Sequence, residues 1–116
     1  MTNDKPLINK QIPQERWEEF CDTFTQGNRG RTVSIEIVGS EVGDQRLANA
    51  VPFSAIDFDT LYKGNSFILS YGSAAPLTTH TVAGPAELWQ AQDEKGVVLA
   101  LEIIDTEDRK TIISFE

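Results

Sequence analysis

Apolar side chains recur with helical spacing in one part of the chain, just after Pro13. The residues at positions i, i+3, i+4 and i+7, which share one face of a helix, are Trp17, Phe20, Cys21 and Phe24. Pro13 suits the first helical position because its missing N–H would be unpaired there anyway, and Gly27 is typical of a helix end. The pattern therefore predicts a helix that begins at Pro13 and ends at Gly27.

From Arg31 onward, apolar and polar positions alternate with the period of a strand. Strands are predicted over residues 33–38, 45–51, 67–71, 79–83, 86–92, 97–104 and 110–116. Residues 53–65 are ambiguous, apart from a turn signal at 63–65. Short charged turns join the last three strands and predict an antiparallel meander there.

These elements predict an α+β domain that is mostly β. We expect six or seven antiparallel strands in a strongly curled sheet or small open barrel, with one N-terminal helix packed on it. The split-barrel or SH3-like class is the nearest architecture. Residues 1–12 are expected to form a tail held only at Leu7 and Ile8, and residues 13–116 a single globular domain.

The lengths of the two C-terminal turns predict which side chains share a face of the meander. A four-residue first turn sets Leu88 opposite Leu101, and pairing Ile104 with Lys110 sets Leu101 opposite Ile113. One face then carries Leu88, Leu99, Leu101, Ile103, Ile113 and Phe115. The other face carries Trp89, Ala91, Val98, Ala100, Ile104 and Ile112, interrupted by Glu87, Glu102 and Ser114.

A sheet that is apolar on both faces needs cover on both faces. The remaining strands can cover one face. For the face that carries Trp89 we expect the aromatic stripe of the helix first, and a second copy of the chain second. Trp89, Val98 and Ile112 are therefore candidate binding or interface residues.

Charge excludes some classes of partner. The chain has 10 basic and 18 acidic residues and a formal net charge of −8, so it repels phosphate backbones and anionic lipid headgroups. We expect no nucleic-acid partner and no membrane partner. The longest apolar run, residues 97–101, is far shorter than the roughly 20 residues that span a bilayer. One cysteine and an N-terminus without an apolar stretch predict a cytoplasmic protein without disulfides.

His80 is the only histidine and the main candidate for acid–base chemistry. If the hairpin over residues 67–83 turns through 73–78, Tyr71 lies opposite His80, and the pair is a candidate binding site. No nucleophile or orienting carboxylate stands at a recognisable spacing from it. We therefore expect no catalytic residue, and interpret His80 as an ordinary strand histidine.

Other chemical motifs fail on closer reading. Cys21 lies on the buried helix stripe, where a thiol packs as a small hydrophobe, and one Cys with one His makes half a zinc site. Residues 57–62 lack the glycine of a calcium loop, and the acidic segment 105–109 is typical of a solvated turn. The basic segment 27–31 follows a helix C-terminus and lacks the ending of a phosphate loop. We expect no metal and no cofactor.

Several packing motifs carry a resemblance to a known family. They are Arg16-Trp17 on the helix, the strand 33–38, Pro85 ahead of the meander, and the runs 101–105 and 111–115. With these motifs the chain resembles, from residue 13 to its end, an uncharacterised family of short bacterial proteins known only as a domain of unknown function. The resemblance implies a bacterial origin and a compact, mostly-β fold. It carries over no functional residue.

The sequence leaves the function unknown and favours a small non-enzymatic binding or protein-interaction module. We expect it to self-associate through the Trp89 face or through the hairpin of Tyr71 and His80. The alternative is a small-molecule-binding protein or cryptic hydrolase with a pocket between helix and sheet, where His80 and a carboxylate supply the polar groups.

Overall fold

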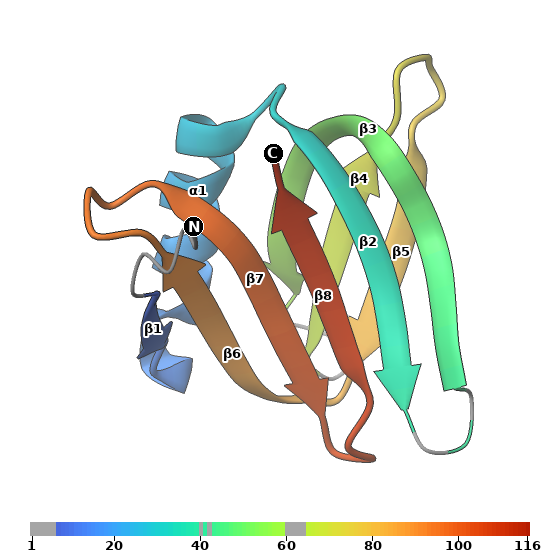
Figure 1. The fold of residues 1–116 in the computed structure, drawn as a ribbon. Coiled ribbons are helices and arrows are strands. Elements are labelled where there is room, and N and C mark those ends of the chain that lie inside the picture. Colours follow the sequence, from blue (N-terminus) through green and yellow to red (C-terminus); the bar gives the residue numbers. More distant parts are fainter. Residues whose placement is uncertain (1–6, 40, 42, 60–64) are drawn as a thin grey trace, which may run out of the picture.

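The computed structural model describes residues 7–39, 41, 43–59 and 65–116 (Figure 1). These residues form, in chain order, β1 (Ile8–Gln11), η1 (Gln14–Arg16), α1 (Trp17–Asn28), β2 (Thr32–Gly39), β3 (Gly43–Asp59), β4 (Ser66–Tyr71), β5 (Thr78–Ala83), β6 (Pro85–Gln92), β7 (Val98–Asp105) and β8 (Lys110–Phe115). The strands form one antiparallel sheet in the order β1-β6-β7-β8-β2-β3-β4-β5. The mostly-β fold with one helix is confirmed, but the sheet has eight strands and is not closed into a barrel.

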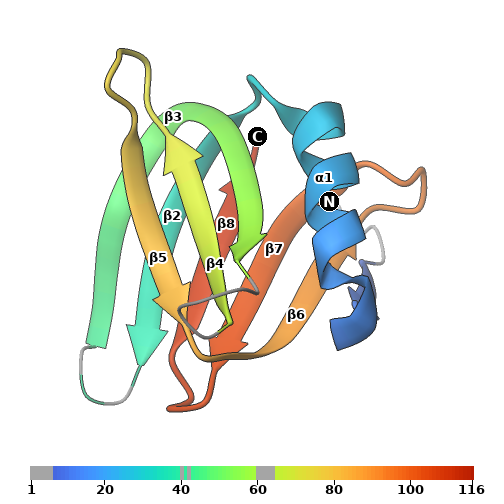
Figure 2. The same ribbon diagram turned by 180° about the vertical axis from the view of Figure 1, so that it is seen from behind.

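The long strand β3 folds the sheet into two layers. Its first half pairs with β2 as far as Pro52, and its second half pairs with β4 from Phe53 onward. Ala50 has a φ of 55°, and the register shifts on both sides of it, so the strand bends sharply there. Figure 2 shows β4 and β5 in front of the other layer.

The predicted strand end before Pro52 is wrong. Pro52 is the last residue of β3 that pairs with β2, so the proline stands where the strand changes partners. The next N–H, of Phe53, donates to the carbonyl of Arg31 at 2.8 Å. The ambiguous residues 53–59 thus continue the strand, whereas most of the turn signal at 63–65 lies outside the described residues.

Helix α1 fills the space beside the second half of β3 (Figure 2). Its predicted apolar stripe faces the core. The Trp17 ring lies 5.0 Å from the ring of Phe67, and the Phe24 ring lies 5.4 Å from that of Phe115. The predicted start is wrong in detail, because Pro13 is extended and precedes the 3-10 turn η1 instead of occupying the first helical position. α1 itself begins at Trp17 and ends at Asn28, one residue beyond the predicted Gly27.

The core face of the meander is largely as predicted, because Leu88, Leu101, Ile103, Ile113 and Phe115 are all buried. Leu99 is only half-buried and does not belong to this core. The pairs Leu101–Ile113 and Ile104–Lys110 are confirmed.

The predicted pair of Leu88 with Leu101 is wrong, since Leu88 lies opposite Ile103. One residue of the difference comes from the turn, since Gln92 pairs with Val98 rather than with Val97, and one comes from a bulge that sets Ala91 opposite Ala100. The resulting shift is two residues, which preserves the face of each side chain beyond the bulge.

The segment 7–12 of the predicted tail contains a strand that the sequence pattern did not predict. β1 pairs with β6 at the edge of the sheet, from Ile8 opposite Gln92 to Gln11 opposite Trp89. All four side chains of β1 are exposed, so no alternation marked it. The indole N–H of Trp17 donates to the carbonyl of Ile12 at 2.9 Å and ties this segment to α1.

Candidate functional site

The outer face of the meander is the first candidate site. It carries Glu87, Trp89 and Ala91 from β6, Ala100, Glu102 and Ile104 from β7, and Lys110, Ile112 and Ser114 from β8. Figure 1 looks onto this face and shows no other strand or helix in front of it. The expectation that the helix covers it is wrong, because Phe24 of α1 packs on Phe115 of the opposite face.

The outer face is mixed rather than apolar. Across the strands, Glu102 lies between Trp89 and Ile112. Both apolar side chains are half-buried without any element above them. The aliphatic stems of charged neighbours shield apolar surface while their charged ends stay in water.

Val98 does not belong to this face. The bulge that pairs Gln92 with Val98 turns its side chain inward, where it packs against the core. It is therefore a packing residue, and only Trp89 and Ile112 of the three predicted residues lie together on the outer face.

A pocket of about 300 Å³ opens beside Trp89. Its lining residues are Asn9, Glu87, Trp89, Glu102 and Ile104. The indole N–H of Trp89 donates to Glu87 Oε1 at 2.8 Å. Two carboxylates, an amide and an indole thus meet in one pocket, and no basic side chain lines it.

The hairpin of β4 and β5 is the second candidate site, and its predicted register is wrong. Tyr71 lies opposite Thr78, and His80 lies opposite Leu69. The loop is shorter than predicted, so Tyr71 and His80 are diagonal rather than direct neighbours on the inner face. Tyr71 is buried in the core, and burial raises the pKa of its hydroxyl. His80 is half-buried, and burial lowers the pKa of its imidazole.

His80 lines a second pocket, of about 210 Å³, under β5. Its lining residues are Ile37, Gln45, His80, Thr81, Val82, Ala83, Asp105, Arg109 and Thr111. Asp105 is the carboxylate in this pocket, but its hydrogen bonds are made within the β7–β8 turn. Its Oδ1 accepts from the backbone N–H groups of Glu107 and Arg109, and its Oδ2 pairs with Arg109 Nε at 3.0 Å.

Burial alone would raise the pKa of Asp105. The hydrogen bonds from the Arg109 and Glu107 backbone and from the Arg109 side chain outweigh burial and, with the Arg109 charge, hold its pKa below the ordinary value. The Asp105 carboxylate therefore stabilises the β7–β8 turn and makes no hydrogen bond that orients the His80 imidazole. The geometry therefore gives His80 no catalytic partner in this pocket.

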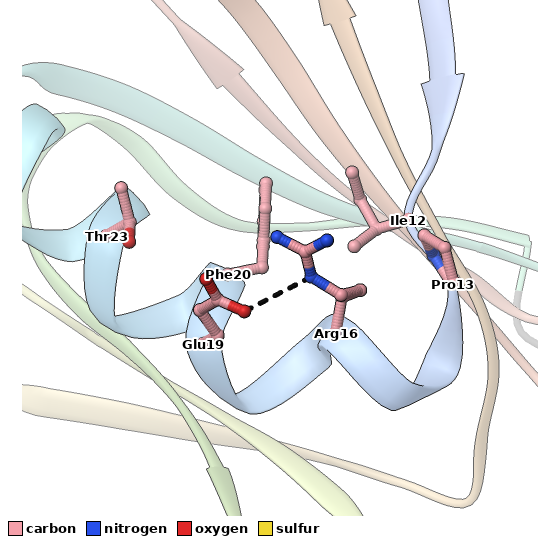
Figure 3. Close-up of a pocket in the computed structure, with 6 residues that line it drawn as sticks. All are labelled: Ile12, Pro13, Arg16, Glu19, Phe20 and Thr23. Carbon is pink, nitrogen blue, oxygen red and sulfur yellow. Dashed lines mark ion pairs between the residues drawn. The ribbon is translucent and has the colours of Figure 1, made fainter.

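A third pocket, of about 360 Å³, lies between the start of α1 and the end of β1 (Figure 3). Its lining residues are Ile12, Pro13, Arg16, Glu19, Phe20 and Thr23. Arg16 Nε pairs with Glu19 Oε1 at 3.1 Å, and Figure 3 shows the terminal guanidinium nitrogens directed between Ile12 and Phe20. All six lining residues come from the segment 12–23, so the pocket lies along the start of the helix, and His80 does not line it.

Cys21 has no features of a reactive thiol. Burial raises its pKa to about 12, with further contributions from the charges of Asp57 and Asp22. Within the described ranges, no group of three or more His, Cys, Asp or Glu side chains could hold a metal ion. Among the described residues, no helix is long and apolar enough to span a membrane, since α1 has only 12 residues.

Comparisons with known proteins confirm the resemblance and add no activity. A model described as a family of unknown function, DUF5335, matches residues 8–116. An uncharacterized protein of the bacterium Aquifex aeolicus (strain VF5) is 25% identical over 107 residues, which cover 92% of this chain and 91% of that protein. No solved structure matches the chain.

Proposed function

The chain belongs to DUF5335, a family of unknown function that brings no assigned activity, and we propose that it is a non-enzymatic interaction module that self-associates through β5. The observation that carries this proposal is the free, uncharged edge of that strand. The partner is a second copy of the chain, which adds its own β5 to the sheet.

β5 is the last strand at one end of the described sheet. It pairs with β4 on one side and ends the strand order, so the backbone groups of its other side have no neighbouring strand among the described residues. Free edges are usually protected by shortness, charge or proline. β1, at the other edge, has four residues and carries Lys10, whereas β5 has six residues and none of these protections. Such an edge is suited to accept another strand.

Charge supports a second copy as the partner. Residues 65–86, which include all of β4 and β5, contain no Asp, Glu, Lys or Arg. The whole chain has a net charge of −8, so two copies repel each other over most of their surfaces. Contact at this hairpin brings no like charges together, and burial lowers the pKa of His80, which favours its neutral form.

The pocket under β5 offers a mixed apolar and polar surface beside the added strand. Ile37 and Gln45, from the hairpin of β2 and β3, line it together with residues of β5. A strand added to β5 would extend the layer of β4 and β5 toward the hairpin of β2 and β3. In a two-fold symmetric dimer each copy makes the same contacts with the other. An interface built around one short strand buries a small area compared with the interfaces of stable dimers. We therefore expect a dimer that dissociates on dilution.

Sedimentation velocity over a range of protein concentrations tests the proposal. Thr79 is exposed on β5, and Thr79→Lys places a charge on the proposed edge. Thr23→Lys adds the same charge at an exposed position of α1 and serves as the matched control. We expect the wild type and Thr23→Lys to dimerise as concentration rises, and Thr79→Lys to remain monomeric. A monomeric wild type, or a dimer that Thr79→Lys leaves intact, contradicts the proposal.

The pocket at α1 supports a second candidate function, the binding of a small apolar carboxylic acid. Ile12 and Phe20 form an apolar floor that packs against the core, and the terminal nitrogens of Arg16 point over it (Figure 3). Guanidinium groups bind carboxylates with two parallel hydrogen bonds. An NMR titration with hexanoate should shift the amides of this pocket in the wild type but not in Arg16→Gln. The absence of shifts in the wild type contradicts this candidate.

A further inference from the structure

We propose that the pocket beside Trp89 binds an organic cation, namely the ammonium or guanidinium group of a lysine or arginine side chain presented by a partner protein. This inference is independent of self-association through β5, because β6 and β5 lie far apart in the strand order. The lining residues Trp89, Glu102 and Ile104 lie on the outer face of the meander. Figure 1 shows no strand or helix in front of this face, so a partner surface can approach it.

The sheet register brings the required groups together. Trp89 lies opposite Glu102, and Glu87 lies opposite Ile104, so an aromatic ring and two carboxylates share one face of two neighbouring strands. Asn9, from β1, completes the lining of the 300 Å³ pocket with its amide. Carboxylates accept charge-assisted hydrogen bonds from a cation, and the Trp ring attracts a cation through its quadrupole.

Trp89 is held in place before any ligand arrives. Its indole N–H donates to Glu87 Oε1 at 2.8 Å, which fixes the ring relative to that carboxylate. A wall that is already oriented needs no ordering when a ligand binds, and this saves part of the entropic cost of binding.

A cation of the chain itself already pairs with one of the carboxylates that line this pocket. Lys110 Nζ is 3.8 Å from Glu102 Oε1, and the two side chains are 49% and 35% exposed. An ion pair this long and this exposed contributes little to stability. Another cation can therefore replace Lys110 at Glu102 at small cost.

The electrostatic field of the whole molecule also favours a positively charged ligand. A net charge of −8 raises the local concentration of cations at the surface and repels anions. Local lining and overall field therefore agree on a positively charged ligand, and Ile104 provides apolar contact for its alkyl stem.

NMR titration of the full chain with blocked amino acids tests the site. The chain has two tryptophans, and the buried indole N–H of Trp17, bonded to Ile12, is an internal reference. We expect Nα-acetyl-lysine methylamide and its arginine counterpart to shift the Trp89 indole signal and leave that of Trp17 unchanged. The neutral norleucine counterpart should leave both unchanged. Equal shifts with norleucine, or none with either cation, would overturn the proposal.

Two pairs of charge-matched variants locate the effect. Lys110→Met removes the competing cation and should tighten binding about two- to five-fold, whereas Lys95→Met, in the exposed β6–β7 turn, should not. Glu102→Gln should weaken binding, and Glu94→Gln, in the same turn as Lys95, should not. Equal effects within either pair show that only the overall field acts, and reject the pocket. Tighter binding of the blocked lysine than of butylammonium supports a side chain of a partner, and the reverse rejects that source in favour of a free amine.

Discussion

The hydroxyl of Thr25 on α1 holds both backbone groups of Ile56 on β3. The N–H of Ile56 donates to Thr25 Oγ1 at 3.0 Å, and Thr25 Oγ1 donates to the carbonyl of Ile56 at 3.1 Å. The pairing of β3 with β2 ends at Pro52. The side of β3 on which Ile56 meets Thr25 therefore has no neighbouring strand in the described part of the chain. One threonine thus takes the place of a neighbouring strand and fixes the helix to the sheet.

Thr25 therefore should be one of the most sensitive polar positions of the chain. Thr25→Val keeps the shape of the side chain but leaves the N–H and carbonyl of Ile56 unpaired in a buried place. We expect the free energy of unfolding to fall by about 2–4 kcal/mol. Thr25→Ser keeps the hydroxyl and should cost about 1 kcal/mol or less, mainly for the lost methyl group. Urea unfolding measures both, and equal losses would show that packing rather than hydrogen bonding is responsible.

The turn between β7 and β8 depends on Asp105. Asp105→Ala removes the acceptor of two backbone N–H groups and the partner of Arg109, so we expect a loss of about 2–3 kcal/mol in the free energy of unfolding. Asp105→Asn keeps one acceptor oxygen for the turn and should lose less, on the order of 1 kcal/mol.

The pH dependence of the Asp105 contribution follows from its pKa. The folded-state pKa is lower than the unfolded one, so the contribution is present above the unfolded value of about 3.9 and is lost as pH falls through the folded value. Unfolding measured between pH 5 and pH 2.5 should therefore show a smaller decline for Asp105→Asn than for the wild type. Parallel curves for the two proteins would contradict this assignment.

The core could be predicted from the sequence because burial leaves a periodic trace. The helix stripe that contains Trp17 and Phe24, and the strand that contains Val33 and Ile35, follow directly from apolar spacing, and the structure buries all four residues. The apolar core face of the meander could be predicted for the same reason.

Register and strand bends could not be predicted in this way, because they depend on contacts distant in sequence. The bulge that moves Val98 to the core, the bend of β3 at Ala50 and the added edge strand β1 have no local signal. The candidate sites depend on just these features. The pairing of Tyr71 with His80 was wrong by two residues, and the pocket beside Trp89 needs Asn9 from a strand that showed no alternation.

Cys21 should be inert in the folded protein. The thiol is 1% exposed, and burial raises its pKa to about 12, so almost no thiolate is present at pH 8. We expect an aromatic disulfide reagent to react with it only as fast as the protein opens. The modification rate should therefore rise in proportion to the unfolded fraction when urea is added. Rapid, urea-independent labelling of the native protein would contradict the buried placement of Cys21.

His80 should make the folded protein less stable in mild acid. Burial lowers its pKa below the unfolded value of about 6.5, so the unfolded chain binds a proton that the folded chain does not. The free energy of unfolding should therefore decline as pH falls through about 6.5 and level off below the folded pKa, while it stays constant above about pH 7.5. Since His80 is the only histidine, His80→Gln should remove this decline, and Thr81→Gln on the same strand should retain it. Urea unfolding at a series of pH values, at protein concentrations low enough to keep the chain monomeric, makes the comparison. A decline of the same size in His80→Gln would mean that another group titrates in this range.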